Sequence, residues 1–356
     1  MACVTLGGEP PKGEAGDSLA RGVVTPPQWC TDNPFTGWTV KRSQACSIAS
    51  GLYTIYEVKN GIRGAVIGTM NFVLYRYLFT SLEEPLIADQ IQVSSTIVTG
   101  AAVGTELVKI DYETGDDFLV GYANLPTTTL TPGVFAQGDA LSSWDVEASS
   151  HAFNQGTWVI AFNSPNVPDI YEIGIESNTA ALAAPPIRCD NELPGRTTSG
   201  CVFIDSVPNI TYNTTSPNVT EFANHVQLAQ ASGLPGSSAS QIPLHRTTVS
   251  STITANRNLA CPQSLPRPDG KSCDEYPFAS TYEGAYASQV INGSSSPRTF
   301  PGCGVTLSGT PSTGAVGYSV CMIDKIQNSA AGSLLNSNLL VPYRIIEGDA
   351  YYVNVE

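Results

Sequence analysis

The cysteines constrain this chain more than any other feature of its sequence. It contains nine, and no two of them have the C-x-x-C spacing that is typical of zinc sites and redox motifs. We therefore expect disulfide bonds. Pairing in sequential order would close short loops, but the cysteines allow many other connectivities. A Cys30–Cys46 bond would leave Cys3 unpaired. The other six cysteines are Cys189, Cys201, Cys261, Cys273, Cys303 and Cys321.

Disulfides and glycosylation sequons together indicate an extracellular protein. Four Asn-x-Ser/Thr triplets begin at Asn209, Asn213, Asn218 and Asn292. The N-terminal residues lack the apolar stretch of a signal peptide, and no window of the sequence approaches a membrane span. We predict a secreted glycoprotein from which the signal has been removed, with no membrane partner.

The composition predicts a mainly β fold with two domains. At 356 residues, 42% of them hydrophobic, the chain can bury enough apolar surface for two cores. Frequent glycine and proline favour short strands joined by turns, and Asn60-Gly61 between two β-rich runs is a strong hairpin signal. We expect an irregular lead-in at 1–28, a β-rich accessory domain resembling a β-sandwich at 29–180, and a second domain at 186–356.

The second domain is predicted to be α+β. Residues 220–236 have apolar residues at helical spacing and end near Gly233, which commonly stops a helix. Residues 327–340 predict another helix, with Asn328 as its N-cap. The tail, 342–355, predicts two strands about a Glu-Gly-Asp turn.

Taken for the whole chain, the net charge of −14 argues against a polyanionic partner, because nucleic-acid-binding proteins usually neutralise phosphates with Lys and Arg. Most of the excess acidity, however, lies in residues 1–185. The charge therefore does not exclude nucleic-acid binding by the second domain.

An adjacent pair of carboxylates stands out in the second domain. Asp274 and Glu275 lie in KSCDEYPFAST, residues 271–281. Because Pro277 favours extended backbone before it, residues 273–276 should form a strand whose successive side chains point to opposite faces. The two carboxylates would then diverge, so that one could face a reaction site while the other anchors the motif. Taken alone, such a pair is more often structural or solvated.

The longer motif around this pair resembles the signature of the NucA/NucB family of secreted deoxyribonucleases. The resemblance is most specific in RPDGKSCDEYPFASTYEGA, residues 267–285. Further segments match in the family's order: RCDNELPGRTTSGCVF (188–203), PLHRTT (243–248), ANRNLACP (255–262), NSAAGSLLNS (328–337) and EGDAYYVNV (347–355). It implies a disulfide-bonded variant of the ββα-metal nuclease fold. It also implies a metal-dependent, non-specific endonuclease that hydrolyses DNA, with RNA as a further candidate substrate.

The resemblance implies roles for individual residues. Asp274 matches the aspartate that takes the place of the superfamily's usual histidine base and activates water, and Glu275 is its catalytic neighbour. Glu283 and Asn336 match metal-binding positions, and Asn328 matches a substrate-binding asparagine near the helix. Hard oxygen ligands of this kind select Mg²⁺ or Mn²⁺, with Ca²⁺ as an alternative, over zinc.

Four further residues are candidates for the site. Arg246 and Arg257 could contact phosphate, since arginine forms bidentate pairs with it, and Arg257 could instead support Glu275. His245 is a candidate catalytic residue, with a purely structural role as the alternative. Ser333 would lie on a small, polar face of the predicted helix, close enough to contact a phosphate.

Two alternatives belong to other functional classes. A glycoside hydrolase could use Asp274 or Glu275 together with Glu283, and would be indifferent to chelators. A non-catalytic binding or adhesion protein would keep the disulfides and tolerate Asp274→Asn. The acidic first domain is a candidate for binding a cell-surface or wall component. His151 and His225 lack any chemical neighbour in the sequence, so neither is proposed as a site residue.

Overall fold

The structure is a computed structural model that describes residues 2–6, 27–32, 34–60, 62–147, 150–174, 184–307 and 313–356. The chain divides into two compact units: Met1–Asn191 with Thr197–Ser206, and Glu192–Arg196 with Val207–Glu356. Each unit has its own apolar core. Strands β13 (Ile187–Asp190) and β14 (Gly200–Phe203) pack in the first unit, although the sequence placed the start of the second domain at 186.

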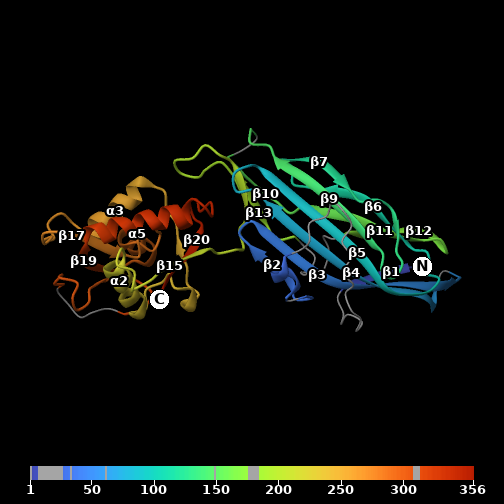
Figure 1. Ribbon diagram of the computed structural model, residues 1–356, viewed down its shortest axis with the longest axis horizontal. Helices are drawn as coiled ribbons and strands as arrows, with labels where there is room; N and C mark the ends of the chain where they lie inside the picture. The colour runs from blue at the N-terminus through green and yellow to red at the C-terminus, as the bar shows by residue number, and fades with distance from the viewer. Residues whose placement is uncertain are drawn as a thin grey trace. The chain divides into compact units, whose positions relative to one another are not determined.

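The first unit consists mainly of antiparallel sheets. The largest has the strand order β1-β3-β4-β5-β9-β7, with β2 paired to β3, and a four-stranded sheet has the order β12-β11-β6-β8. The long strands β3, β4 and β5 lie side by side in Figure 1. The bounds are β1 (Ala2–Leu6), α1 (Gln28–Thr31), β2 (Gly37–Lys41), β3 (Gln44–Lys59), β4 (Ile62–Thr80), β5 (Leu86–Gly100), β6 (Glu106–Glu113), β7 (Phe118–Asn124), β8 (Thr128–Thr129), β9 (Phe135–Trp144), β10 (His151–Asn154), β11 (Thr157–Ser164) and β12 (Val167–Gly174).

Alternation of buried and exposed side chains explains this sheet structure. Along β9 every second residue is buried, as expected for a strand with one face on the core. Tyr53 and Phe72 of the large sheet share that core with Trp158 and Phe162 of the four-stranded sheet. The predicted hairpin between β3 and β4 is confirmed, with Asn60 at φ 54°, while Gly61 lies outside the described residues.

The first residues of the chain differ from the expectation of an irregular lead-in. Strand β1 (Ala2–Leu6) pairs antiparallel with β3, so this part of 1–28 is a sheet edge. Residues 7–26 of the predicted lead-in lie outside the described residues, and its last residue, Gln28, begins α1.

The second unit is α+β, as predicted. Strand β20 (Ala350–Val355) lies between β15 (Asn209–Tyr212) and β16 (Leu244–His245), and β19 (Tyr318–Asp324) lies between β17 (Lys271–Tyr276) and β18 (Pro297–Arg298). The helices are α2 (Thr220–Ala231), η1 (Ser238–Ser240), α3 (Ser250–Ala260), α4 (Ala285–Asn292), α5 (Lys325–Leu335) and η2 (Asn336–Leu340). Helix α5 packs on the antiparallel pair β17–β19, as Figure 1 shows.

Several local predictions need correction. Helix α5 begins after Asp324, whose carboxylate accepts hydrogen bonds from the backbone N–H groups of Ile326 and Gln327. Asn328 is therefore inside the helix, and its predicted role as N-cap is wrong. The tail forms one strand, β20, rather than two. Helices α3 and α4 were not predicted, because their many small and polar residues give little apolar periodicity.

The disulfides follow the sequential pattern. Cys30 is bonded to Cys46, Cys189 to Cys201, Cys261 to Cys273 and Cys303 to Cys321. Cys273 and Cys321 lie on neighbouring strands, β17 and β19, and their disulfides attach the segments around Cys261 and Cys303 to this antiparallel pair. The strand that carries Asp274 and Glu275 is thus held by covalent bonds as well as by its sheet.

Candidate active site

A pocket of about 340 Å³ opens beside strand β17 in the second unit. Four predicted site residues line it: Asp274 and Glu275 from β17, Arg257 from α3, and Asn328 from α5. Because α5 follows β19 directly and packs on β17, the helix brings Asn328 to the strand that carries the carboxylates. Aromatic and aliphatic residues complete the lining, among them Tyr212, Phe222, Phe278, Leu335 and Leu340.

Asp274 is buried, 5% exposed, and is held by a histidine. Its Oδ2 lies 2.6 Å from Nδ1 of His225, and Nε2 of His225 lies 2.9 Å from Oγ of Ser319. His225 belongs to α2 and Ser319 to β19, and both are buried. Three elements that are distant in the sequence therefore converge behind the carboxylate.

His225 and Ser319 are the residues that the sequence analysis missed. Their partners are 49 and 94 residues away along the chain, so no local motif connects them. One signal was available: His225 follows Phe222 by three positions and precedes Val226, and thus lies on the apolar face of the predicted helix. A histidine on a buried helix face needs a polar partner.

Glu275 has different polar contacts from Asp274, but both carboxylates line the same pocket, so they do not face separate sites as the strand alternation predicted. Its Oε2 lies 3.3 Å from Sγ of Cys261, which is in a disulfide and has no proton to donate. Burial, with the nearby charge of Asp274, raises the pKa of Glu275 to about 7, although the Arg257 guanidinium acts to lower it. Near neutral pH this carboxyl is therefore partly protonated.

Asn328 is fixed by its amide nitrogen. Nδ2 donates to Oγ of Ser272 at 3.1 Å and to the carbonyl oxygen of Cys273 at 3.4 Å. Because both bonds use the nitrogen, the amide oxygen remains for a pocket ligand.

His245 and Glu283 bind each other and do not line this pocket. The Glu283 carboxylate accepts from Nδ1 of His245 at 2.8 Å and from the His245 backbone N–H at 2.9 Å. The hydrogen bond from Glu283 raises the pKa of His245, while burial acts to lower it. With both carboxylate oxygens engaged, Glu283 is tied to the β16 segment.

The other three predicted residues also lie outside the lining of the pocket. Arg246 is buried and its guanidinium donates to the carbonyl oxygen of Ile345. Ser333 is exposed and donates to the carbonyl oxygen of Ser329, one turn earlier in α5. Asn336 is exposed where α5 ends. The structure thus brings four of the predicted residues into one pocket and leaves the other five outside its lining.

The oxygen donors of the pocket fit a hard divalent cation. Within the described ranges, no three His, Cys, Asp or Glu side chains converge as a metal cluster. The pocket does combine the carboxylates of Asp274 and Glu275 with the amide of Asn328. Mg²⁺ often binds proteins through only one or two side chains while keeping several waters, so this donor set suits Mg²⁺ or Mn²⁺ better than zinc.

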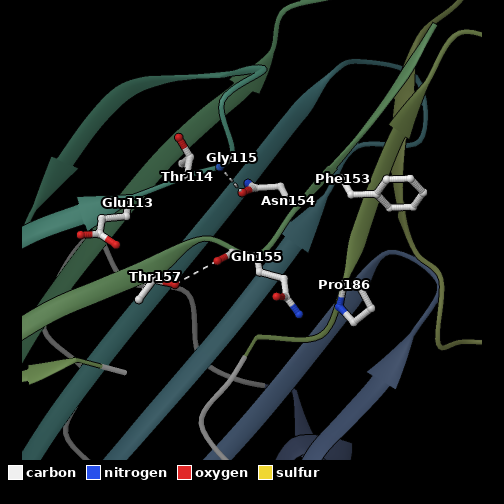
Figure 2. Close-up of a pocket in the computed structure, with 8 residues that line it drawn as sticks. All are labelled: Glu113, Thr114, Gly115, Phe153, Asn154, Gln155, Thr157 and Pro186. Carbon is white, nitrogen blue, oxygen red and sulfur yellow. Dashed lines mark hydrogen bonds between the residues drawn. The ribbon is translucent and has the colours of Figure 1, made fainter. Parts of the chain in front are cut away.

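The first unit has a pocket of its own, of about 500 Å³ (Figure 2). There Asn154 Oδ1 accepts from the Gly115 N–H, and Thr157 Oγ1 donates to the Gln155 carbonyl oxygen, each at 3.0 Å. Among its described lining residues, Glu113 is the only charged one. A pocket lined by no Lys or Arg side chain is poorly suited to binding a phosphodiester. We therefore place the candidate active site in the second unit.

Comparison with known proteins agrees with this placement. Residues 240–354 match the family model described as deoxyribonuclease NucA/NucB, which suggests DNase activity and DNA as the substrate. No curated protein matches the chain. The matched region covers β16 to β20 and thus includes Arg257, Asp274, Glu275 and Asn328, whereas His225 precedes it. The disulfides and this domain are consistent with an extracellular protein, and none of the helices in the described residues is long and apolar enough to cross a membrane.

Proposed function

Given that residues 240–354 form a NucA/NucB deoxyribonuclease domain, we propose that the protein is a secreted endonuclease that hydrolyses DNA with little sequence preference. The observation that carries the proposal is the placement of Asp274 in the pocket beside Arg257 and Asn328. A base, a cation and an amide in one pocket are the groups that phosphodiester hydrolysis requires.

Asp274 is the proposed general base. One of its carboxylate oxygens is bound by His225, which leaves the other to accept a proton from water in the pocket. Arg257 would attract the phosphate, because guanidinium groups bind phosphate oxygens through paired hydrogen bonds. The apolar side chains in the lining lower the local dielectric constant, which would strengthen these electrostatic interactions.

A divalent cation belongs to the proposal. Glu275 and Asn328 would hold Mg²⁺ or Mn²⁺, with Ca²⁺ as the alternative, through their oxygen atoms. When bound, the ion would supply positive charge beside the phosphate and lower the pKa of water. Glu283 and Asn336, the ligands expected from the sequence, lie outside this pocket lining. The finer fold assignment, a ββα-metal nuclease, is supported by α5 following directly after β19 and packing on β17.

The family match favours a nuclease over the glycoside hydrolase and the binding protein. For the glycoside hydrolase, Glu283 would have to face Asp274 or Glu275 across a substrate, but Glu283 is bound to His245 and does not line the pocket. RNA as a second substrate, and recognition of a cell surface by the first unit, remain predictions.

Nicking of supercoiled plasmid tests the proposed function. We expect the purified protein to nick DNA with Mg²⁺ or Mn²⁺, to stop when EDTA is added, and to resume when the metal is restored. Nicking that continues in EDTA would contradict the metal requirement. Failure to cleave DNA with any of the three metals would reject the nuclease and favour the binding protein.

A further inference from the structure

The contacts behind Asp274 form a connected and buried chain of hydrogen bonds. His225 is 1% exposed and Ser319 is fully buried, so the chain lies beneath the pocket and not in it. His225 does not line the pocket, whereas Asp274 does. The histidine is therefore shielded from any substrate by the carboxylate that it binds.

We propose that His225 is a positioning residue, which fixes the rotamer of the Asp274 carboxylate so that one oxygen faces the pocket. This inference rests on the proposed function and goes beyond it. Nδ1 of His225 lies 2.6 Å from Oδ2 of Asp274, and donation across this contact leaves Oδ1 for the reaction. Histidine cannot itself be the base here, because no solvent or substrate reaches its side chain.

In this proposal, Ser319 donates its proton to Nε2 of His225 and so places the proton of the neutral ring on Nδ1. Its hydroxyl lies 2.9 Å from Nε2 of His225 and 3.3 Å from the carbonyl oxygen of Tyr276. The hydroxyl has one proton, and the shorter contact is to the histidine. When Ser319 donates to Nε2, the neutral ring must carry its own proton on Nδ1, which is the atom that faces Asp274. The partner behind a histidine commonly sets its tautomer in this way.

The histidine comes from an element outside the family match. Helix α2 precedes residues 240–354, and Phe222, Val226 and Ala229 anchor it in the core of the second unit. The position of His225 is therefore set by a packed helix and not by a loop. A rigid donor of this kind restricts the carboxylate more than water would, and small displacements of a catalytic group can reduce rates strongly.

Two amide substitutions separate positioning from packing. Asn at position 225 places its amide nitrogen near the site of Nδ1, whereas Gln places its amide near Nε2. We expect His225→Gln to lower kcat for DNA cleavage by about 10- to 100-fold with KM unchanged, as for other residues that orient catalytic groups. His225→Asn should recover most of the wild-type kcat. Calorimetric unfolding of both variants provides the control for folding.

Unchanged kcat in His225→Gln would overturn the inference. It would also be overturned if both variants lost activity in proportion to their loss of thermal stability, since that is the pattern of a structural residue. If the wild-type protein cleaved no DNA, the proposed function would be rejected. The proposed role of His225 in catalysis would then be rejected too. If the wild-type protein cleaves DNA and His225→Gln cleaves it equally fast, only the positioning role is rejected.

The tautomer gives a readout that does not depend on activity. The chain has three histidines, so ¹⁵N resonances of its imidazole rings can be assigned by substitution. We expect the neutral His225 ring to be protonated at Nδ1, and Ser319→Ala to weaken this preference. A neutral ring protonated at Nε2 would contradict donation to Asp274 and overturn the proposal.

Discussion

Arg257 is the residue that we propose to bind the phosphate of the substrate. It is exposed on α3 and lines the pocket, and its charge acts to lower the pKa of Glu275. No ion pair of Arg257 is found among the residues that the structure describes. A guanidinium that is not tied to a carboxylate can exchange solvent for phosphate at low cost. The acidity of the whole chain therefore says little about this site.

We expect Arg257→Ala to raise KM for DNA about tenfold at low salt and to reduce the salt slope of binding by about one, because one phosphate contact is lost. The measurement is KM over a series of salt concentrations. Lys325→Ala is the matched control, since it removes the same charge from an exposed position outside the pocket lining. Equal effects of both variants would mean that only net charge matters.

The residues of the site were predictable only where the chemistry is local. Asp274 and Glu275 stand next to each other, and Pro277 indicates an extended strand, so β17 followed from the sequence. The expected divergence of the two carboxylates did not, since both line one pocket. The bond from His225 to Asp274 spans 49 residues, and the fold alone creates it. Glu283 was predicted at the site but lies outside the pocket lining, because it is bound to His245 from another segment of the chain.

At the scale of secondary-structure elements, helix α5 depends on a cap at its start. The Asp324 carboxylate accepts from the backbone N–H groups of Ile326 at 2.8 Å and Gln327 at 3.1 Å. We expect Asp324→Ala to lower the free energy of unfolding of the second unit by about 1 kcal/mol, as for other lost N-caps. Calorimetry measures it, with exposed Ser329→Ala as the control inside the same helix. A similar loss in both variants would show that Asp324 does not act as a cap.

A second set of hydrogen bonds joins the turn before β20 to the residues that precede α3. The Glu347 carboxylate accepts hydrogen bonds from Thr247, Thr248 and Tyr282. Although partial burial acts to raise the pKa of Glu347, the hydrogen bonds from Tyr282, Thr248 and Thr247 outweigh it and lower the pKa.

The lowered pKa of Glu347 predicts a loss of stability in acid. A carboxyl with a folded-state pKa below its unfolded value stabilises the protein above the unfolded pKa, and this contribution is lost as the pH falls through the folded value. We expect the unfolding temperature of the second unit to drop as the pH falls below about 4.5. Glu347→Gln should reduce this part of the drop. An identical pH dependence in the variant would exclude Glu347 as its source.

The strands and helices differ in how well the sequence predicts them. The β3–β4 hairpin and α2 were predictable, because each carries a strong periodic pattern and a turn or stop residue. Helices α3 and α4 were not, since α3 buries only two of its residues, Asn256 and Ala260. Asn256 is itself a tertiary contact, bonding the backbone at Ala279, Thr281 and Ala287, and no local pattern indicates it.

At the scale of the whole molecule, the two units have separate cores and separate disulfides. All four tryptophans, Trp29, Trp38, Trp144 and Trp158, belong to the first unit. Tryptophan fluorescence therefore reports the unfolding of that unit. The composition predicted two domains. It could not predict that β13 and β14 pack in the first unit, because their cysteines, Cys189 and Cys201, stand in the sequence as the first two of six that run on into the second unit.

Selective unfolding tests the independence of the units. We expect Asp324→Ala to lower the calorimetric transition of the second unit while the tryptophan transition stays at the same temperature, because the substitution touches one core only. Thermal scans by fluorescence and calorimetry on the same sample make the comparison. A tryptophan transition that shifts together with the calorimetric one would show that the two units unfold as one.

The central claim is that Asp274, presented by β17, is the base of a nuclease. Its most direct test is the kcat for DNA cleavage by Asp274→Asn beside Asp269→Asn, which removes the same charge from an exposed position two residues before β17 begins. We predict a loss of about 10²- to 10⁴-fold for Asp274→Asn, the range for a lost general base, and wild-type kcat for Asp269→Asn. Cleavage by Asp274→Asn at the wild-type rate would contradict the claim.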